Sequence, residues 1–244
     1  HRHRRSGRHS KLTPPHQLEV SFEELAAAIP ATIGVAIVRP GRAKVSLGRW
    51  SCGVAWSTIK VPLAIAALRR DRPRAHELVI KAITESDNHA SEQLWSQLGE
   101  PVDAARQVQA VVNECGGAAP LVESQRIRPG FTAFGQTRWA LADQARFAAH
   151  LARVPDAADV VELMRQLVAD QRWGLAAKGV AAKGGWGPVA HSGYLVRQFG
   201  IVPTDSAHVG VAMAAEARGF EAGIEVVNAM TQWLAGHLPG LTER

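Results

Sequence analysis

The chain has 244 residues, of which 46% are hydrophobic and 20% are charged. This length can bury a sizeable core, in one large domain or in two lobes that share a core. The apolar fraction and the mixture of charges exclude disorder as the main state. The longest uncharged apolar run, residues 61–68, is far shorter than the ~20 residues of a membrane-spanning helix, so no transmembrane segment is expected.

The net charge of +6 is concentrated at the N-terminus. Residues 1–18 contain no acidic residue and five of the 28 basic ones: Arg2, Arg4, Arg5, Arg8 and Lys11. We expect residues 1–18 to form a disordered basic arm, because the rest of the chain, with 23 basic against 22 acidic residues, is nearly neutral. A nucleic-acid partner is not expected, since the sequence has no RNA-recognition aromatics or zinc-finger spacing.

The predicted elements begin with an amphipathic helix over residues 18–29, followed by a hairpin whose strands cover residues 32–38 and 44–50. A series of helices is then predicted over residues 61–70, 78–82, 90–98, 102–112, 140–152 and 157–169, interrupted by a loop at 115–138. Strands over residues 179–185, 194–202 and 208–215 precede a last helix at 221–238. Strands grouped at both ends of the chain favour an α/β (α+β) fold with an antiparallel sheet over βαβ units.

Ser57 and Lys60 form the one Ser-x-x-Lys sequence of the chain, just before an apolar helix. The spacing places both side chains on one face of a helix. A serine becomes a good nucleophile when a neighbouring base accepts its proton, and a lysine can be that base when burial lowers its pKa. The alternative is a helix-capping serine followed by a solvated lysine.

Two further motifs have the same ambiguity. Ser86 and Asn88, in Ser-Asp-Asn between two helices, can project into a cleft, or the segment can be an ordinary turn with Asp87 as a helix cap. Lys183 and Gly185, in Lys-Gly-Gly at the end of a strand, can offer a cation and a ligand-pairing backbone, or form a glycine-rich turn.

Taken together and in this order, the three motifs resemble the Ser-x-x-Lys, Ser-Asp-Asn and Lys-Thr-Gly set of class A β-lactamases and penicillin-binding proteins. The surrounding segments, AWSTIKVPLAIAAL and AITESDNHASEQLWSQLGEP, are also similar to that superfamily, and the resemblance covers about residues 20–240. It implies a β-lactamase/transpeptidase-like domain over residues 19–244. An α/β lobe, about residues 19–70 and 171–244, would face an all-helical lobe, about residues 71–170.

The resemblance assigns a role to each motif residue. Ser57 would be the acyl-accepting nucleophile and Lys60 its base, while Ser86 would relay a proton and Asn88 would orient substrate. Lys183 would supply positive potential that also helps to keep Lys60 neutral. The backbone N–H of Ser57 and one from the strand after Lys183 would form an oxyanion hole.

The sequence departs from the family in the loop that carries the deacylating glutamate, usually Glu-x-x-Leu-Asn. Glu123, in Glu-Ser-Gln-Arg-Ile, is the one carboxylate between Glu114 and Asp143 and does not fit that pattern. Without a base to activate water, efficient β-lactam hydrolysis is not expected unless Glu123 points at the nucleophile.

A second departure lies in the third motif, where Gly184 replaces the hydroxyl residue that helps to hold substrate carboxylates. Arg197, on the next strand, is a candidate replacement because a guanidinium binds carboxylates bidentately, and a surface strand residue is the alternative. His191-Ser192-Gly193 is a rival for the third motif, but the strand context favours Lys183. Trp56 and Trp186 are expected to flank the cleft.

No metal or cofactor is implied. The two cysteines, Cys52 and Cys115, are far apart in sequence and form no Cys-x-x-Cys pair. They are compatible with one disulfide or with two free thiols. Two functions remain open. The first is a serine hydrolase that forms an acyl-enzyme on Ser57, acting on peptidoglycan-type peptides or a related amide or ester. The second is a cell-envelope binding or scaffold protein that has lost turnover. The resemblance implies an extracytoplasmic location: secreted, periplasmic or tethered through a removed segment before His1.

Overall fold

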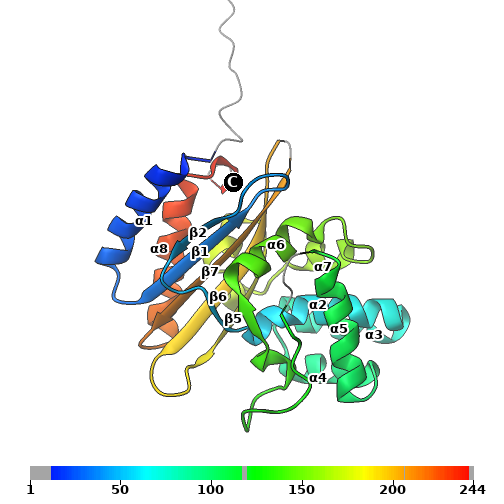
Figure 1. Ribbon diagram of the computed structural model, residues 1–244. Coiled ribbons are helices and arrows are strands. Elements are labelled where there is room, and N and C mark those ends of the chain that lie inside the picture. Colours follow the sequence, from blue (N-terminus) through cyan, green and yellow to red (C-terminus); the bar gives the residue numbers. More distant parts are fainter. Residues whose placement is uncertain (1–11, 117–119, 206, 242–244) are drawn as a thin grey trace, which may run out of the picture.

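The computed structural model describes residues 12–116, 120–205 and 207–241 (Figure 1). Its centre is a five-stranded antiparallel sheet, whose strands are, in spatial order, β2 (Val45–Gly48), β1 (Thr32–Val38), β7 (His208–Ala217), β6 (Tyr194–Pro203) and β5 (Ala181–Pro188). The two ends of the chain therefore build one sheet, as the predicted strands indicated, and β5, which carries Lys183, forms one of its edges.

Helices cover both faces of this sheet. Helices α1 (Pro15–Ala28) and α8 (Phe220–Ala235) lie on one face, and α6 (Leu141–Leu151) packs on β1, β6 and β7 from the other (Figure 1). The predicted fold class, an antiparallel sheet flanked by helices, is confirmed. Helix α1 begins at Pro15, so residues 15–18 are helical, whereas residues 1–11 of the expected basic arm lie outside the described residues.

A helical layer lies beyond α6. Helix α2 (Lys60–Arg70) contacts α3 (Arg72–Thr84), α4 (Asn88–Gln97) and α5 (Pro101–Asn113), and α7 (Ala158–Leu163) packs against α2 and α3. Two helices lie on the other side of the expected lobe boundaries. Helix α2, expected in the α/β lobe, packs with the helical layer, and α6, expected in the helical lobe, packs on the sheet. No helix in the described part of the chain combines the length and apolar character needed to cross a membrane.

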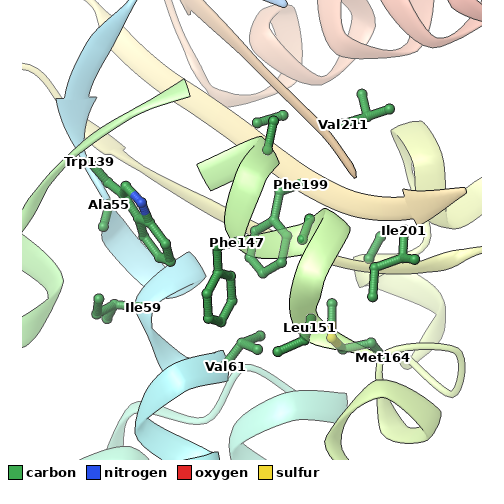
Figure 2. Close-up of a cluster of buried hydrophobic side chains, with 14 of the residues drawn as sticks. Ala55, Ile59, Val61, Trp139, Phe147, Leu151, Met164, Phe199, Ile201 and Val211 are labelled. Atoms are coloured by element: carbon green, nitrogen blue, oxygen red, sulfur yellow. The ribbon is translucent and has the colours of Figure 1, made fainter. Parts of the chain in front are cut away.

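The core between the sheet and the helical layer fixes the segment that carries Ser57 and Lys60 (Figure 2). Trp139, Phe147 and Phe199 meet there, with ring centroids 5.3–6.2 Å apart. Ala55 and Ile59, on either side of Ser57, are fully buried in the same core. Trp139 belongs to β4 (Arg138–Ala140), which pairs with β3 (Cys52–Val54) in a small second sheet that the sequence did not predict. The core therefore holds the turn that carries Ser57 in a fixed position.

Short 3-10 turns complete the described chain: Trp56–Ile59, Phe134–Gln136, Ala169–Gln171, Gly174–Lys178 and Pro239–Leu241.

Candidate active site

Ser57 lies in the 3-10 turn Trp56–Ile59, which runs directly into α2. The buried Thr58 hydroxyl donates to the carbonyl of Ala55 (2.6 Å) and fixes the turn. Trp56 has φ of 51°, a left-handed conformation that is strained for a bulky residue and is typical of functional sites. Ser57 itself is partly exposed and lines a cavity. The nucleophile candidate is therefore accessible at a rigid turn.

Lys60, one turn further on, is 1% exposed. Its Nζ donates to the carbonyl oxygen of Ser86 (2.6 Å), to Ser86 Oγ (3.1 Å) and to Asn88 Oδ1 (2.8 Å). Burial lowers the pKa of Lys60 to about 7, against an opposing effect of the Asp87 carboxylate. Near neutral pH part of the protein therefore has a neutral Lys60, which donates two of these hydrogen bonds and keeps a lone pair that can accept a proton. Ser57 is not among these hydrogen-bond partners, but both side chains line the same cavity.

Ser86 lies between the two lysines of the motifs. Its φ of 56° is left-handed, and in this conformation both its carbonyl and its hydroxyl contact Lys60. Asp87 caps α4 by accepting from the backbone N–H of Ala90 (2.7 Å), so the predicted helix cap and the predicted cleft-facing serine are both present. The left-handed turn is a cost of order 1 kcal/mol that the cap and the two lysine contacts offset.

Lys183, on β5, reaches the same hydroxyl from the opposite side. Its Nζ donates to Ser86 Oγ (2.9 Å) and to the Gly184 carbonyl (2.8 Å), and the side chain is 0% exposed. The pKa of Lys183 lies well below its usual range, first because of burial and then because of the Lys60 charge. For Lys60, burial is the main cause of the lowered pKa, whereas the sequence interpretation gave part of this role to Lys183. Hydrogen bonds thus connect Lys60, Ser86 and Lys183, and a proton can pass between the two amines through the Ser86 hydroxyl.

Gly185 brings β5 against the nucleophile turn. A methyl group built on Gly185 would lie 2.7 Å from the backbone nitrogen of Ser57 and 2.9 Å from the Ala55 carbonyl oxygen, so another side chain would separate the strand from the turn. The indole ring of Trp56 packs in the same way on Gly187. Strand backbone thus runs beside the Ser57 N–H, as an oxyanion site between the two requires.

The cavity in front of Ser57 has a volume of about 450 Å³. Trp56 and Trp186 both line it, as expected. Two charged residues on its wall, Glu92 and Arg126, form an ion pair (2.7 Å) that the sequence interpretation missed. Glu92 lies one helical turn after Asn88, and this spacing on α4 could have placed it on the same face.

Glu123 is not part of the cavity wall. Its carboxylate accepts from the backbone N–H of Gln125 (3.1 Å), and its own N–H donates to the Thr137 hydroxyl (3.0 Å). The condition for a deacylating role, a carboxylate that points at Ser57, is not met in this structure.

Arg197 is not brought to the cavity either. It is 0% exposed, and its guanidinium donates to the carbonyls of Gly53 (3.0 Å) and Val54 (3.1 Å) and to Gln144 Oε1 (3.1 Å). Arg197 is therefore a buried structural side chain. It is neither the carboxylate anchor nor the surface strand residue that the sequence suggested.

The remaining alternatives are also resolved by position. His191 is exposed in the turn between β5 and β6, whereas Lys183 contacts Ser86, so the structure brings Lys183 and not His191 to the serine. Cys52 is an exposed free thiol and Cys115 a buried one, and the two do not form a disulfide. Within the described residues, no group of three or more His, Cys, Asp or Glu side chains could hold a metal ion.

The antiparallel sheet with helices on both faces is the fold of class A β-lactamases and penicillin-binding proteins. Comparison with solved structures gives the same result. The chain matches "Structure of PBP-A" with a TM-score of 0.65 and 20% identity, over 93% of this chain and 100% of that one. It matches a class A β-lactamase from Bacteroides cellulosilyticus with a TM-score of 0.73 and 15% identity, over 96% and 100%. TLA-3 extended-spectrum β-lactamase matches with a TM-score of 0.68 and 14% identity, over 91% and 99%. No family model matches the sequence, and no curated protein matches it.

Proposed function

We propose that the protein is a serine hydrolase that forms an acyl-enzyme on Ser57 and acts on an amide or ester such as a peptidoglycan-type peptide. The supporting observation is the position of Ser86 Oγ, within 3.1 Å of Lys60 Nζ and 2.9 Å of Lys183 Nζ, in front of a partly exposed Ser57. Two buried amines without a paired carboxylate are costly, and such perturbed groups are concentrated at catalytic sites.

Acylation uses each of these groups. Neutral Lys60 accepts the Ser57 proton as Oγ bonds to the carbonyl carbon, and the carbonyl electrons move to the oxygen, which the Ser57 N–H and β5 backbone stabilise. When the bond to the leaving group breaks, Ser86 Oγ donates a proton to the leaving atom and is reprotonated from Lys60. Water then hydrolyses the acyl-enzyme and regenerates the Ser57 hydroxyl.

The second step is expected to be slow, and β-lactam hydrolysis poor. Glu92 is the one carboxylate on the cavity wall among the described residues, and it is paired with Arg126, whereas Glu123 does not line the cavity. A water molecule therefore lacks a free carboxylate base. This observation also supports the alternative function, a cell-envelope binding or scaffold protein of this fold with little or no turnover. For either function, we propose an extracytoplasmic location by analogy with the fold superfamily.

The test is covalent labelling with two probes, a neutral alkyl fluorophosphonate and a fluorescent penicillin. Trypsin is expected to release Ser57 in the peptide of residues 50–60, which also contains Ser51. We expect the fluorophosphonate to form one adduct per chain, which fragmentation locates on Ser57, and any penicillin adduct to lie on the same residue. Ser57→Ala and Lys60→Met should abolish it, whereas Ser51→Ala, an exposed serine in the same peptide, should retain it.

Two outcomes would count against the proposal. An adduct that survives in Ser57→Ala would exclude Ser57 as the nucleophile. A folded protein that neither probe labels would support the binding or scaffold function.

A further inference from the structure

The charges near Ser57 determine which substrates the site can take. Lys60 and Lys183 are both buried and both donate to Ser86, and Lys183 is absent from the cavity wall. Lys183 is enclosed, and Lys60 lines the cavity but its Nζ is already hydrogen-bonded to Ser86 and Asn88, so neither amine is available as an anion anchor.

Gly184, the residue after Lys183, has no space for a side chain that carries a hydroxyl group. A methyl group built on Gly184 would lie 2.6 Å from the indole ring of Trp173, which is 6% exposed and packs beside Trp186 with ring centroids 6.2 Å apart. A serine or threonine side chain would need the space that this ring fills. Arg197 is committed to carbonyls in the core.

Among the described residues that line the cavity, Arg126 is the one arginine, and it is not free to bind an anion. Arg126 NH2 donates to Glu92 (2.7 Å) and NH1 to the Phe131 carbonyl (2.9 Å). Because both residues line the cavity, the pair adds no net charge to its wall, and the Glu92 carboxylate occupies the guanidinium that a substrate carboxylate would need. Besides Lys60 and this ion pair, the titratable side chains on the described part of the wall are the exposed His89 and the partly exposed Tyr194.

One part of the wall is aromatic. Among the described residues, the side chains of Trp56, Phe131, Phe134, Trp186 and Tyr194 line the cavity. Trp56 and Phe131 meet edge to face at 5.0 Å, and Arg128 lies over both rings, at 5.6 Å and 4.6 Å. Arg128 also donates to the Pro188 carbonyl (2.9 Å) and so connects the loop to β5. These contacts hold the Trp56 and Phe131 rings in a fixed position beside the nucleophile.

From these observations we propose that the site takes an uncharged acyl substrate, an ester, thioester or amide with apolar groups and no carboxylate next to the bond that breaks. This inference rests on the proposed function and narrows it, because it disfavours peptides that end in a free carboxylate. In the acylation step, the Ser57 Oγ–acyl bond replaces the acyl–leaving group bond, and the neutral alcohol, thiol or amine leaves with the proton from Ser86.

A matched pair of thioesters tests the proposal. Both have a phenylacetyl group, and the leaving thiols are mercaptoacetate, with a carboxylate, and its methyl ester, without one. We expect kcat/KM for the methyl ester to exceed that for the acid at least tenfold. An equal or higher kcat/KM for the acid would overturn the proposal.

The Glu92→Gln variant tests whether the Glu92–Arg126 ion pair causes the preference for the uncharged substrate. Loss of the Glu92 charge frees Arg126 for a substrate carboxylate, so the ratio of the two kcat/KM values should fall severalfold. Glu77→Gln, the same change at an exposed position on α3, should leave the ratio as it is. A ratio that is the same in Glu92→Gln as in the wild type would contradict the role given to the ion pair.

Acylation measured by intact mass separates this inference from the proposed function. If the fluorophosphonate labels Ser57 but the methyl ester neither acylates it nor is turned over, the substrate proposal fails and the hydrolase proposal stands. If no probe labels Ser57, the hydrolase proposal fails.

Discussion

Replacing Lys60 with methionine should remove activity and stabilise the protein at neutral pH. The pKa of Lys60 falls from 10.5 to about 7 on burial. One pKa unit corresponds to about 1.4 kcal/mol, so keeping this amine in the folded protein at pH 7 costs about 4 kcal/mol relative to the unfolded chain. The variant also loses three hydrogen bonds, each worth about 1 kcal/mol. The net gain for Lys60→Met at pH 7 is therefore about 1 kcal/mol, or roughly 3 °C in Tm.

The pH dependence is the sharper part of this prediction. Between pH 7 and 10.5 the unfolded chain binds a proton at Lys60 that the folded protein does not, so raising the pH stabilises the wild type. The advantage of Lys60→Met should shrink by about 2 kcal/mol between pH 7 and pH 9.

Urea denaturation of wild type and variant at several pH values measures this difference. Lys81→Met, at an exposed position on α3, serves as the control and should show no such pH dependence. Parallel stability curves for wild type and Lys60→Met from pH 7 to pH 9 would refute the reasoning, because they would mean that Lys60 stays protonated in the folded protein.

Three other predictions concern the same site and its support. The ¹³Cε resonance of Lys60, assigned by its absence in Lys60→Met, should titrate with a midpoint at about 7, and a midpoint near 10.5 would disprove the lowered pKa. Gly185→Ala should slow labelling of Ser57 by about 100-fold, because its methyl group separates β5 from the Ser57 N–H. Gly219→Ala, where the methyl group meets no atom within 4 Å, should label normally, and equal rates in the two variants would refute the close approach. Arg197→Ala leaves the Gly53 and Val54 carbonyls unpaired in the core and should lower the unfolding free energy by about 3 kcal/mol. Calorimetry against Arg70→Ala, an exposed arginine on α2, checks this, and equal Tm values in the two would contradict a structural role.

The sequence predicts the sheet well because its strands are long apolar runs. The predicted strand 32–38 matches β1 residue for residue, and the predicted strands 194–202 and 208–215 match β6 and β7 to within two residues. Helix ends were less predictable. The helix predicted over 157–169 ends at Leu163, because the Met164 carbonyl accepts from Ala182 on β5 and the Val168 N–H donates to Thr84. These partners are distant in sequence, so local periodicity could not reveal them.

Motif spacing indicated the residues that gather at the candidate site, because Ser57, Lys60, Ser86 and Lys183 each lie in a recognisable sequence motif. Side chains defined by long-range packing were not predictable in this way. The ring of Trp173 that closes the Gly184 position comes from an irregular segment, and the Arg126–Glu92 pair joins a loop to α4. For Arg197 a signal did exist: it alternates with Phe199 and Ile201 on one face of β6, and that face is buried.

The most direct test of the central claim is the rate of covalent labelling of Ser57 by the fluorophosphonate as a function of pH. If the neutral amine of Lys60 activates Ser57, the rate rises with pH and reaches a plateau, with a midpoint at about 7. A rate that is independent of pH between 6 and 8, or one that is unchanged in Lys60→Met, would contradict the account.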